Sequence, residues 1–280
     1  MFDIAPELQD RFNGSFDAVM ELDGEIFREK EGRRTLMFSH GGKQYFAKLH
    51  SGIGWGEIFK NLTSLKLPVV DASNEWLAVD LLESCGVDTV KIVGKGTRGS
   101  NPAKRESFVI MEALDERVEV EDFLKDIGGL TDLTRKARWR LRKEIIKTVA
   151  QAAKKMHGAG MNHRDFYLCH FHIAERDWQQ WAGEVLRLPL LDLHRAQIRS
   201  KVPRRWLVKD LGALYFSALD AELTNRDVVT FLREYLGADW RKRCRENLAF
   251  WQAVSARAAS FYQKHRQKPA PLPAAVANFS

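Results

Sequence analysis

The sequence predicts an α+β fold in two parts, a small antiparallel sheet with one helix followed by a mainly helical part. Residues 24–50 contain short β-prone runs separated by Glu31-Gly32 and Gly41-Gly42, which are typical of tight turns. Two further β-prone runs lie at 89–93 and 107–111, and helical spacing dominates after Met111. This order, strands first and helices later, favours segregated layers over alternating βα units.

The first part is expected to span residues 1–113. Its strands are predicted at residues 26–27, 35–38, 45–49, 89–93 and 107–111, and the run 16–22 is a candidate edge strand. A helix is expected to begin at Ser73 or Asn74, both good N-caps, and to continue through Glu83. The glycine-rich segment 52–56 predicts a loop before that helix.

The second part is expected to span residues 114–268. From Arg135 to His157 apolar residues recur every three or four positions, which predicts an amphipathic helix that ends at Gly158 and Gly160. Further helices are predicted at 210–220, 226–236 and 241–262. Residues 269–280 carry three prolines among alanines and are expected to form a disordered tail.

The composition is that of a globular protein. Of 280 residues 45% are hydrophobic and 29% are charged, and no run approaches the roughly 18 apolar residues of a membrane span. The first residues lack the basic start and apolar block of a signal peptide. The three cysteines are scattered without the spacing of metal ligands. We therefore expect a cytoplasmic protein.

Positive charge is concentrated toward the C-terminus. Residues 195–268 contain sixteen Lys or Arg and seven Asp or Glu, an excess of nine, whereas the whole chain carries a net charge of +7. This segment indicates an anionic partner such as acidic phospholipid, a polyanionic substrate or nucleic acid. The alternative is a solvated cationic surface without a partner.

Three charged positions in chain order indicate phosphoryl transfer. His163-Arg164-Asp165 has the form of the catalytic loop of protein kinases, and Asp192 lies where those enzymes keep a metal-binding aspartate. Lys48, in the run Tyr-Phe-Ala-Lys, corresponds to the lysine that binds nucleotide phosphates. His163, Arg164, Asp165 and Lys48 are thus the candidate catalytic residues, and together they predict a two-lobed protein-kinase-like fold.

A nucleotide site is expected in the first part of the chain. Kinases pair the phosphate-binding lysine with a glutamate on a helix. Glu75 is favoured here because apolar residues follow it at helical spacing, and Glu57 is the alternative. The turn before the second long strand has a single glycine, so Arg33 or Arg34 is a candidate for contacting phosphate directly. Met111 and Ala113 complete the predicted ATP site.

Asp192 is the expected Mg²⁺ ligand, because it ends an apolar, strand-like run (186–191) after the catalytic loop. Where kinases keep a second ligand, an asparagine, this chain has His170. Mg²⁺ prefers oxygen donors, so His170 is a doubtful ligand and is instead expected to bind a phosphate oxygen or to orient Asp165. Asp210 is expected to bond the backbone of the catalytic loop, although an N-cap role explains it nearly as well.

Four stretches together resemble the lipopolysaccharide core heptose(I) kinases. They are Lys-Leu-His-Ser-Gly-Ile-Gly-Trp-Gly-Glu (48–57), His-Arg-Asp-Phe-Tyr-Leu-Cys-His-Phe (163–171), Leu-Asp-Leu-His-Arg-Ala-Gln (191–197) and Lys-Asp-Leu-Gly-Ala-Leu-Tyr-Phe-Ser-Ala (209–218). The resemblance implies ATP-dependent phosphorylation of the first heptose of a lipopolysaccharide precursor on lipid A, by a protein peripheral at the inner face of a Gram-negative inner membrane. It also implies association with acyl carrier protein.

The acceptor is expected to bind to the basic segment that follows Asp192. Inner-core lipopolysaccharide carries phosphates and sugar-acid carboxylates, so cations suit it; the candidates are Arg195, Arg199, Lys201, Arg204 and Arg205. Alternatives are a kinase of another core sugar or of protein tyrosine, and a noncatalytic kinase-like module at a membrane surface. Nucleic acid is a less favoured partner.

Overall fold

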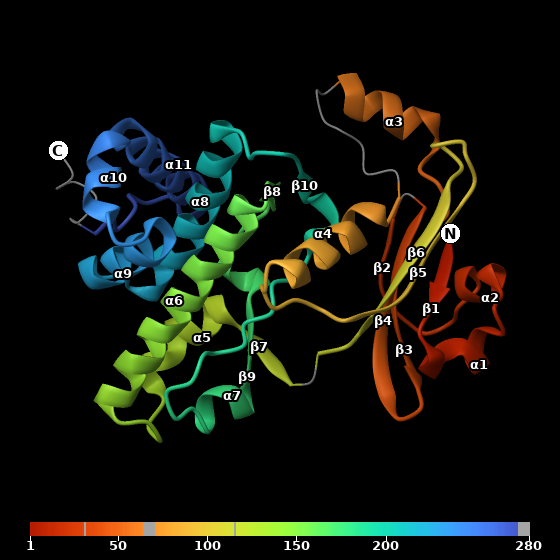
Figure 1. Ribbon diagram of the computed structural model, residues 1–280, viewed down its shortest axis with the longest axis horizontal. Coiled ribbons are helices and arrows are strands. Elements are labelled where there is room, and N and C mark those ends of the chain that lie inside the picture. Colours follow the sequence, from red (N-terminus) through yellow and green to blue (C-terminus); the bar gives the residue numbers. More distant parts are fainter. Residues whose placement is uncertain (31, 64–70, 115, 274–280) are drawn as a thin grey trace. The chain divides into compact units, whose positions relative to one another are not determined.

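The computed structural model describes residues 1–280 except 31, 64–70, 115 and 274–280 (Figure 1). The chain divides into two compact units. Unit 1 comprises residues 1–80, 90–114 and 192–195, and unit 2 comprises 81–89, 115–191 and the residues from 196 onward. The first change of unit after the sheet follows Leu114, next to the predicted limit at residue 113. Two short segments, 81–89 and 192–195, depart from a simple division in chain order.

Unit 1 is built on a six-stranded antiparallel sheet with the order β1-β5-β6-β4-β3-β2. Its strands are β1 (Phe2–Ile4), β2 (Glu25–Lys30), β3 (Arg33–His40), β4 (Lys43–His50), β5 (Ile92–Arg98) and β6 (Glu106–Glu112). Gly41 and Gly42, both with positive φ, close the hairpin between β3 and β4. Along β4 every second side chain from Tyr45 to Leu49 is buried, as a sheet with one face on a core requires.

Short helices cover one face of this sheet. The turn η1 (Pro6–Leu8) and the helices α1 (Gln9–Phe12) and α2 (Phe16–Met20) place Leu8, Phe12 and Val19, one from each, in a core with the sheet residues Leu36 and Phe108. The candidate edge strand at 16–22 is therefore wrong. Ser15 accepts a hydrogen bond from the Ala18 N–H at 3.2 Å, and this N-cap starts a helix in place of a strand.

Two more helices follow the hairpin, so the sheet carries more than the single helix expected. α3 (Gly54–Thr63) occupies part of the predicted loop, and Gly52 before it has a φ of 86°. A Cβ at Gly52 would lie 2.7 Å from the Ala103 carbonyl oxygen, so only glycine fits there. α4 (Ser73–Ser84) begins at the predicted residue and buries Trp76 against Val109 of β6.

Unit 2 is mainly helical. Its helices are α5 (Val120–Asp126), α6 (Arg135–Gly158), α7 (Glu175–Gln179), α8 (Arg204–Ala218), α9 (Asn225–Leu236), α10 (Trp240–Glu246) and α11 (Leu248–Arg266). α8 packs against α11 and α6 packs against α9 (Figure 1). Two small antiparallel pairs join β8 (Met161–Asn162) to β10 (Gln197–Ile198) and β7 (Arg117–Glu119) to β9 (His172–Ala174).

Several boundaries differ from expectation. β5 (Ile92–Arg98) begins and ends later than the predicted strand at 89–93. α8 begins at Arg204 after Pro203, so Asp210 lies in its second turn and is not an N-cap. The last predicted helix is split at Asn247, whose N–H bonds back to Arg243 and Cys244 carbonyls. Segment 186–191 is not a regular strand, because only Leu190 forms bridges. Of the predicted tail, residues 269–273 are neither helix nor strand, and the remainder lies outside the described residues.

Within the ranges that the structure describes, no helix is long and apolar enough to cross a membrane.

Candidate active site

In unit 1, Lys48 and Glu75 form an ion pair. Lys48 lies in β4, between β3 and β6, and its Nζ donates to Glu75 Oε1 at 2.5 Å. Glu75 is only 3% exposed and lies in the first turn of α4, where the helix dipole favours a carboxylate. This pair fixes the ammonium group near the middle of the strand, as a phosphate-binding lysine requires.

The start of α4 is held in place by Asp71. Its Oδ1 accepts from the Ser73 N–H at 2.9 Å, and its Oδ2 accepts from Arg105 at 3.0 Å. Burial alone would raise the pKa of Asp71, but the hydrogen bonds from Ser73 and Arg105 outweigh it and lower that pKa. Asp71 therefore stays ionised and keeps Glu75 at a fixed position opposite Lys48.

The other predicted nucleotide residues have varied surroundings. Arg34 donates through Nη2 to the Met20 and Leu22 carbonyls, both at 2.9 Å, which gives this side chain a structural task in unit 1. Arg33 contributes to the low pKa of His50 and stays a candidate for phosphate contact. Met111 is buried, and the Ala113 N–H donates to the Gln44 carbonyl at 2.9 Å.

In unit 2, the catalytic-loop residues follow β8 and are anchored by Asp210. This fully buried carboxylate accepts from the His163 N–H at 2.7 Å through Oδ2 and from the Arg164 N–H at 2.9 Å through Oδ1. Arg164 has a φ of 76°, an uncommon value for a residue with a Cβ. The two charge-assisted bonds hold this backbone turn immediately before Asp165.

A second layer supports Asp210. His157, in the last turn of α6, lies 3.4 Å from Asp210 through Nε2 and 2.9 Å from the Tyr235 hydroxyl through Nδ1. Burial, with the nearby charge of Asp210, raises the pKa of Tyr235, so its hydroxyl stays protonated. The loop is thus tied to α6, α8 and α9 at once.

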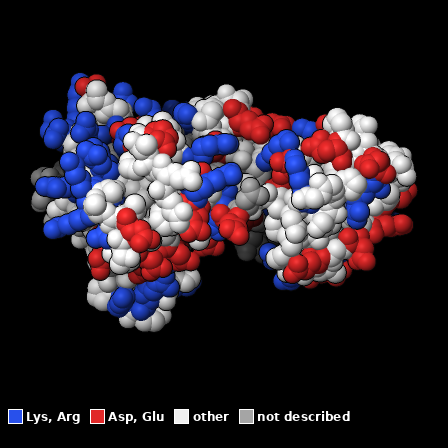
Figure 2. Space-filling model, turned by 90° about the horizontal axis from the view of Figure 1, so that it is seen from below, with Lys and Arg blue, Asp and Glu red and all other residues white. Residues whose placement is uncertain are grey.

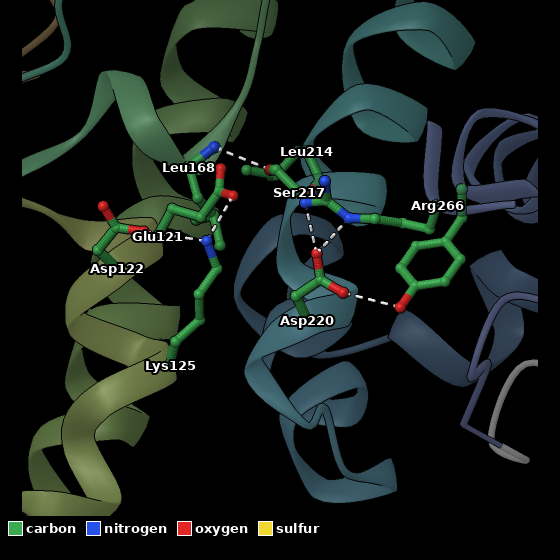
Figure 3. Close-up of polar contacts among 9 residues, drawn as sticks. Glu121, Asp122, Lys125, Leu168, Leu214, Ser217, Asp220 and Arg266 are labelled. Carbon is green, nitrogen blue, oxygen red and sulfur yellow. Dashed lines mark hydrogen bonds and ion pairs between the residues drawn. The ribbon is translucent and has the colours of Figure 1, made fainter. Parts of the chain in front are cut away.

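The segment after Asp165 is also fixed. The Leu168 N–H donates to Ser217 Oγ at 2.9 Å, and that hydroxyl donates to the Leu214 carbonyl (Figure 3). His170 Nδ1 lies 2.7 Å from the Asp165 carbonyl oxygen, so this ring nitrogen donates to the loop. Its ring stacks on that of His163, whose Nε2 donates to the Leu191 carbonyl. Asp165 is therefore half-buried between two anchored flanks.

Asp192 follows Leu191 and belongs to unit 1. It has a φ of 60°, its side chain is 41% exposed, and its Oδ1 lies 2.6 Å from His194 Nδ1. A partly exposed carboxylate suits a hard cation such as Mg²⁺. Among the described residues, no group of three or more His, Cys, Asp or Glu side chains could hold a metal ion.

The predicted acceptor residues are divided between the two units. Arg195 lies in the turn η4 (Leu193–Arg195) of unit 1, and Lys201 is exposed in unit 2. Arg199 donates to Asn162 Oδ1 and to Gln197 Oε1, both at 2.7 Å. Arg204 lies over the Phe250 ring, whereas Arg205 lies over the ring of Trp206. Lys and Arg side chains also crowd the end of unit 2 that carries α10 and α11 (Figure 2).

Sequence reasoning missed an apolar cavity inside unit 2. Its volume is about 110 Å³, and it lies among α5, α6, α8, α9 and α11. The lining is almost entirely aliphatic and aromatic, and includes Leu124, Ile145, Leu211, Phe231 and Trp251. Figure 3 shows polar contacts of the same part of the unit. Lys125 pairs with Glu121 within α5, and Arg266 of α11 pairs with Asp220 of η5 (Leu219–Ala221). Apolar helix spacing predicts buried faces but not a space left between them.

The chain is similar to several known proteins. A model of the lipopolysaccharide kinase (Kdo/WaaP) family matches residues 17–235. The lipopolysaccharide core heptose(I) kinase WaaP of Pseudomonas aeruginosa is 43% identical over 252 residues, which cover 90% of this chain and 91% of the relative. WaaP of Escherichia coli K12 is 45% identical over 235 residues, covering 83% and 85%.

A solved structure is similar as well. The structure of WaaP in complex with acyl carrier protein matches with a TM-score of 0.78 and 36% identity, and covers 94% of this chain and 99% of its own. The α+β, kinase-like fold class is thereby confirmed, and so is the expectation of a phosphotransferase. On the strength of these matches, the chain belongs to the lipopolysaccharide kinase (Kdo/WaaP) family.

Proposed function

We propose that this protein phosphorylates the first heptose of the lipopolysaccharide core, with ATP as the phosphate donor. The observation that carries this proposal is the catalytic loop, in which Asp210 holds the backbone of His163 and Arg164 immediately before Asp165. The names of the relatives supply the acceptor, because they are heptose(I) kinases at 40–45% identity. A kinase of another core sugar is the second candidate.

Unit 1 would bind the nucleotide and unit 2 would act on the acceptor. The Lys48 ammonium, held by Glu75, would neutralise the α- and β-phosphates of ATP. Mg²⁺ would be held by Asp192 through oxygen, and it would neutralise charge on the phosphates. We do not assign His170 as a metal ligand, because imidazole is a poor Mg²⁺ ligand. The hydrogen bond from its Nδ1 to the Asp165 carbonyl gives the ring a positioning role in the loop.

Asp165 would orient the attacking sugar hydroxyl. As the bond between that oxygen and the γ-phosphorus forms, the bond from the phosphorus to the β-phosphate oxygen breaks and ADP leaves. The proton of the hydroxyl passes to the Asp165 carboxylate. The anchored flanks keep the carboxylate in one position, and positioning supplies much of the rate enhancement in phosphoryl transfer.

The test is phosphate transfer from labelled ATP to defined acceptors. Lipopolysaccharide precursors truncated after the first heptose should accept phosphate on that sugar, and precursors that end before it should not. Location of the phosphate by mass spectrometry decides between heptose and the other core sugars. Transfer to precursors lacking heptose would contradict the proposal.

We further propose acyl carrier protein as a partner, with its acyl chain in the apolar cavity of unit 2. A similar protein was solved in complex with acyl carrier protein, and the cavity lining offers an apolar chain almost no polar group. Leu211→Gln would introduce a polar group into this lining and should weaken binding of acylated carrier protein. Unacylated carrier protein should bind weakly to both forms. Equal binding of the acylated and unacylated forms by the wild type would overturn the role of the cavity.

A peripheral position at the inner face of the inner membrane follows from the proposed acceptor, which is anchored in a membrane. The basic end of unit 2 supports it, because a surface rich in Lys and Arg is attracted to anionic lipid. Co-sedimentation with anionic and neutral vesicles would test it, and equal binding to both would argue against an electrostatic attachment.

A further inference from the structure

Four cations of unit 2 surround a single indole ring. The Lys209 Nζ lies 4.2 Å from the ring centroid of Trp206, and the guanidinium carbons of Arg164, Arg205 and Arg199 lie at 5.4, 5.5 and 6.0 Å. We call these five residues the Trp206 cluster. Elsewhere in the described residues, each aromatic ring that has a cation over it has a single one. Like charges about one ring repel one another, and Arg199 and Arg205 are the two that form no ion pair with a carboxylate of the described residues, so an anion bound beside them would be stabilised.

The backbone explains why the cluster lies beside the catalytic loop. Trp206 and Asp210 are four residues apart on α8, so they share a face of the helix. Asp210 accepts hydrogen bonds from the two residues before Asp165, and Arg164 is one of them. Arg199 enters from the β10 side and is fixed by Asn162 of β8, which precedes the loop. The cluster is therefore built from the same elements that position Asp165.

Charge and exposure leave the cluster able to take a ligand. Arg205 is exposed, and Arg164, Arg199 and Lys209 are half-buried. Within the part of the chain that the structure describes, neither Arg199 nor Arg205 forms an ion pair with a carboxylate, since the partners of Arg199 are the neutral Asn162 and Gln197. α8 begins in the cluster without a side-chain cap and without an acidic residue in its first turn, which leaves its positive end to add to the field.

We infer that the Trp206 cluster binds an anionic group of the acceptor, a sugar-acid carboxylate or a phosphate, on a residue close to the reacting hydroxyl. Arginine side chains suit both groups, since a guanidinium can give two parallel hydrogen bonds to either. This inference rests on the proposed function and adds to it the chemical feature by which the acceptor is recognised. It also brings in Trp206 and Lys209, which the pattern of basic residues alone does not select.

The experiment compares acceptor binding and turnover in variants that remove one charge each. Arg205→Gln and Lys209→Gln should each raise the Michaelis constant for the acceptor about tenfold, as expected for one lost charge-assisted contact. The Michaelis constant for ATP and the melting temperature should stay near wild type. Arg205→Lys should recover only part of the loss, because lysine keeps the charge but not the two parallel hydrogen bonds. The effect should shrink as ionic strength rises.

Lys143→Gln is the matched control. Lys143 Nζ lies 5.5 Å from the ring of Trp139 in α6, a single cation on an indole ring within the same unit. Its loss should leave the acceptor Michaelis constant unchanged. An equal increase in Lys143→Gln and Arg205→Gln would show a general surface-charge effect and would overturn the inference.

Two treated acceptors distinguish the sources of the anion. If a carboxylate is bound, chemical reduction of the acceptor carboxyls should raise the wild-type Michaelis constant and should have little effect on Arg205→Gln. If a phosphate is bound, enzymatic dephosphorylation of the acceptor should instead raise the wild-type Michaelis constant and have little effect on Arg205→Gln. If neither treatment changes the wild-type constant, the cluster does not bind the acceptor.

Acceptor binding without ATP separates this inference from the proposed function. Titration of wild type with detergent-dispersed acceptor should give binding that Arg205→Gln and Lys209→Gln weaken. Binding of this kind without any phosphate transfer would refute the proposed function and retain the cluster. Transfer with wild-type Michaelis constants in both variants would retain the proposed function and refute the role of the cluster.

Discussion

Replacement of Asp210 by asparagine tests how far the catalytic loop depends on one buried carboxylate. Asp210 is fully buried and accepts from two main-chain N–H groups at 2.7 and 2.9 Å. Asn offers one carbonyl oxygen and one NH₂ group, so one N–H of the loop would face another donor. A hydrogen bond to a charged group contributes about 1.5–3 kcal/mol, and a buried donor left unpaired costs about 1–3 kcal/mol. We expect Asp210→Asn to lower the free energy of unfolding by about 2–4 kcal/mol.

The same change should reduce turnover. The loop would shift to relieve the clash between donors, and a displacement near 1 Å can cost about 100-fold in rate. Urea unfolding followed by circular dichroism gives the stability, and kinase assays at saturating ATP and acceptor give the turnover number. The expected pattern is a lowered turnover number in protein that is still folded at the assay temperature.

Asp220→Asn is the control. Asp220 also accepts from two groups, the Tyr262 hydroxyl at 2.7 Å and Arg266, but these bonds tie η5 to α11 and do not reach the loop (Figure 3). Asp220 and Arg266 are partly exposed, and an asparagine keeps an oxygen that accepts from the buried Tyr262 hydroxyl, so we expect a loss of about 1 kcal/mol or less and unchanged turnover. The reasoning is refuted if Asp210→Asn has wild-type turnover, or if Asp220→Asn lowers turnover equally.

Three further outcomes are expected. Lys48→Ala should abolish measurable transfer and weaken ATP binding. Lys43→Ala, at the exposed start of the same strand, should do neither. Normal ATP binding by Lys48→Ala would contradict the role assigned to Lys48. Burial, followed by the positive charge of Arg33, lowers the pKa of His50 from 6.5 to about 4, so the folded protein favours the neutral ring. The contribution of His50 to the free energy of unfolding should therefore be fully present above pH 6.5 and should fall by up to about 3 kcal/mol as the pH drops toward 4. In urea unfolding, His50→Asn should show a weaker pH dependence than wild type. An equal pH dependence in both proteins would contradict the assignment. His170→Asn should retain part of the turnover and His170→Ala should lose more, because an amide can replace the bond to the Asp165 carbonyl; a wild-type preference for Mn²⁺ that disappears in His170→Ala would instead identify a metal ligand.

The sequence predicted the sheet, the long helix and the order of charged motifs, because each depends on local patterns. Alternation along β4 and the spacing of apolar residues in α6 are properties of neighbouring residues. Glu75 could be chosen over Glu57 for the same reason, since a helix with an apolar face follows it. The strand predicted at residues 16–22 was wrong because Ser15 caps a helix there. This cap decides the structure of Phe16–Met20 in spite of their β-prone composition.

Other features depend on contacts between distant segments and were beyond reach of the sequence. The start of α8 was placed at Asp210 because an acidic residue after a basic loop resembles an N-cap, yet the helix begins six residues earlier, at Arg204, directly after Pro203. Spacing alone would have put Trp206 and Asp210 on one face once that start was known. The support of Asp210 by His157 and Tyr235, and the cavity among five helices, require the tertiary packing itself.

The most direct measurement of the account is the transfer of phosphate from ATP to heptose by wild type and Asp165→Ala. Wild type should place one phosphate on the first heptose of a truncated lipopolysaccharide precursor. Asp165→Ala should bind ATP and acceptor normally, melt near the wild-type temperature, and turn over about 10² to 10⁴-fold more slowly, the range for a lost acid–base group. A folded Asp165→Ala protein with near-wild-type transfer would contradict the central claim.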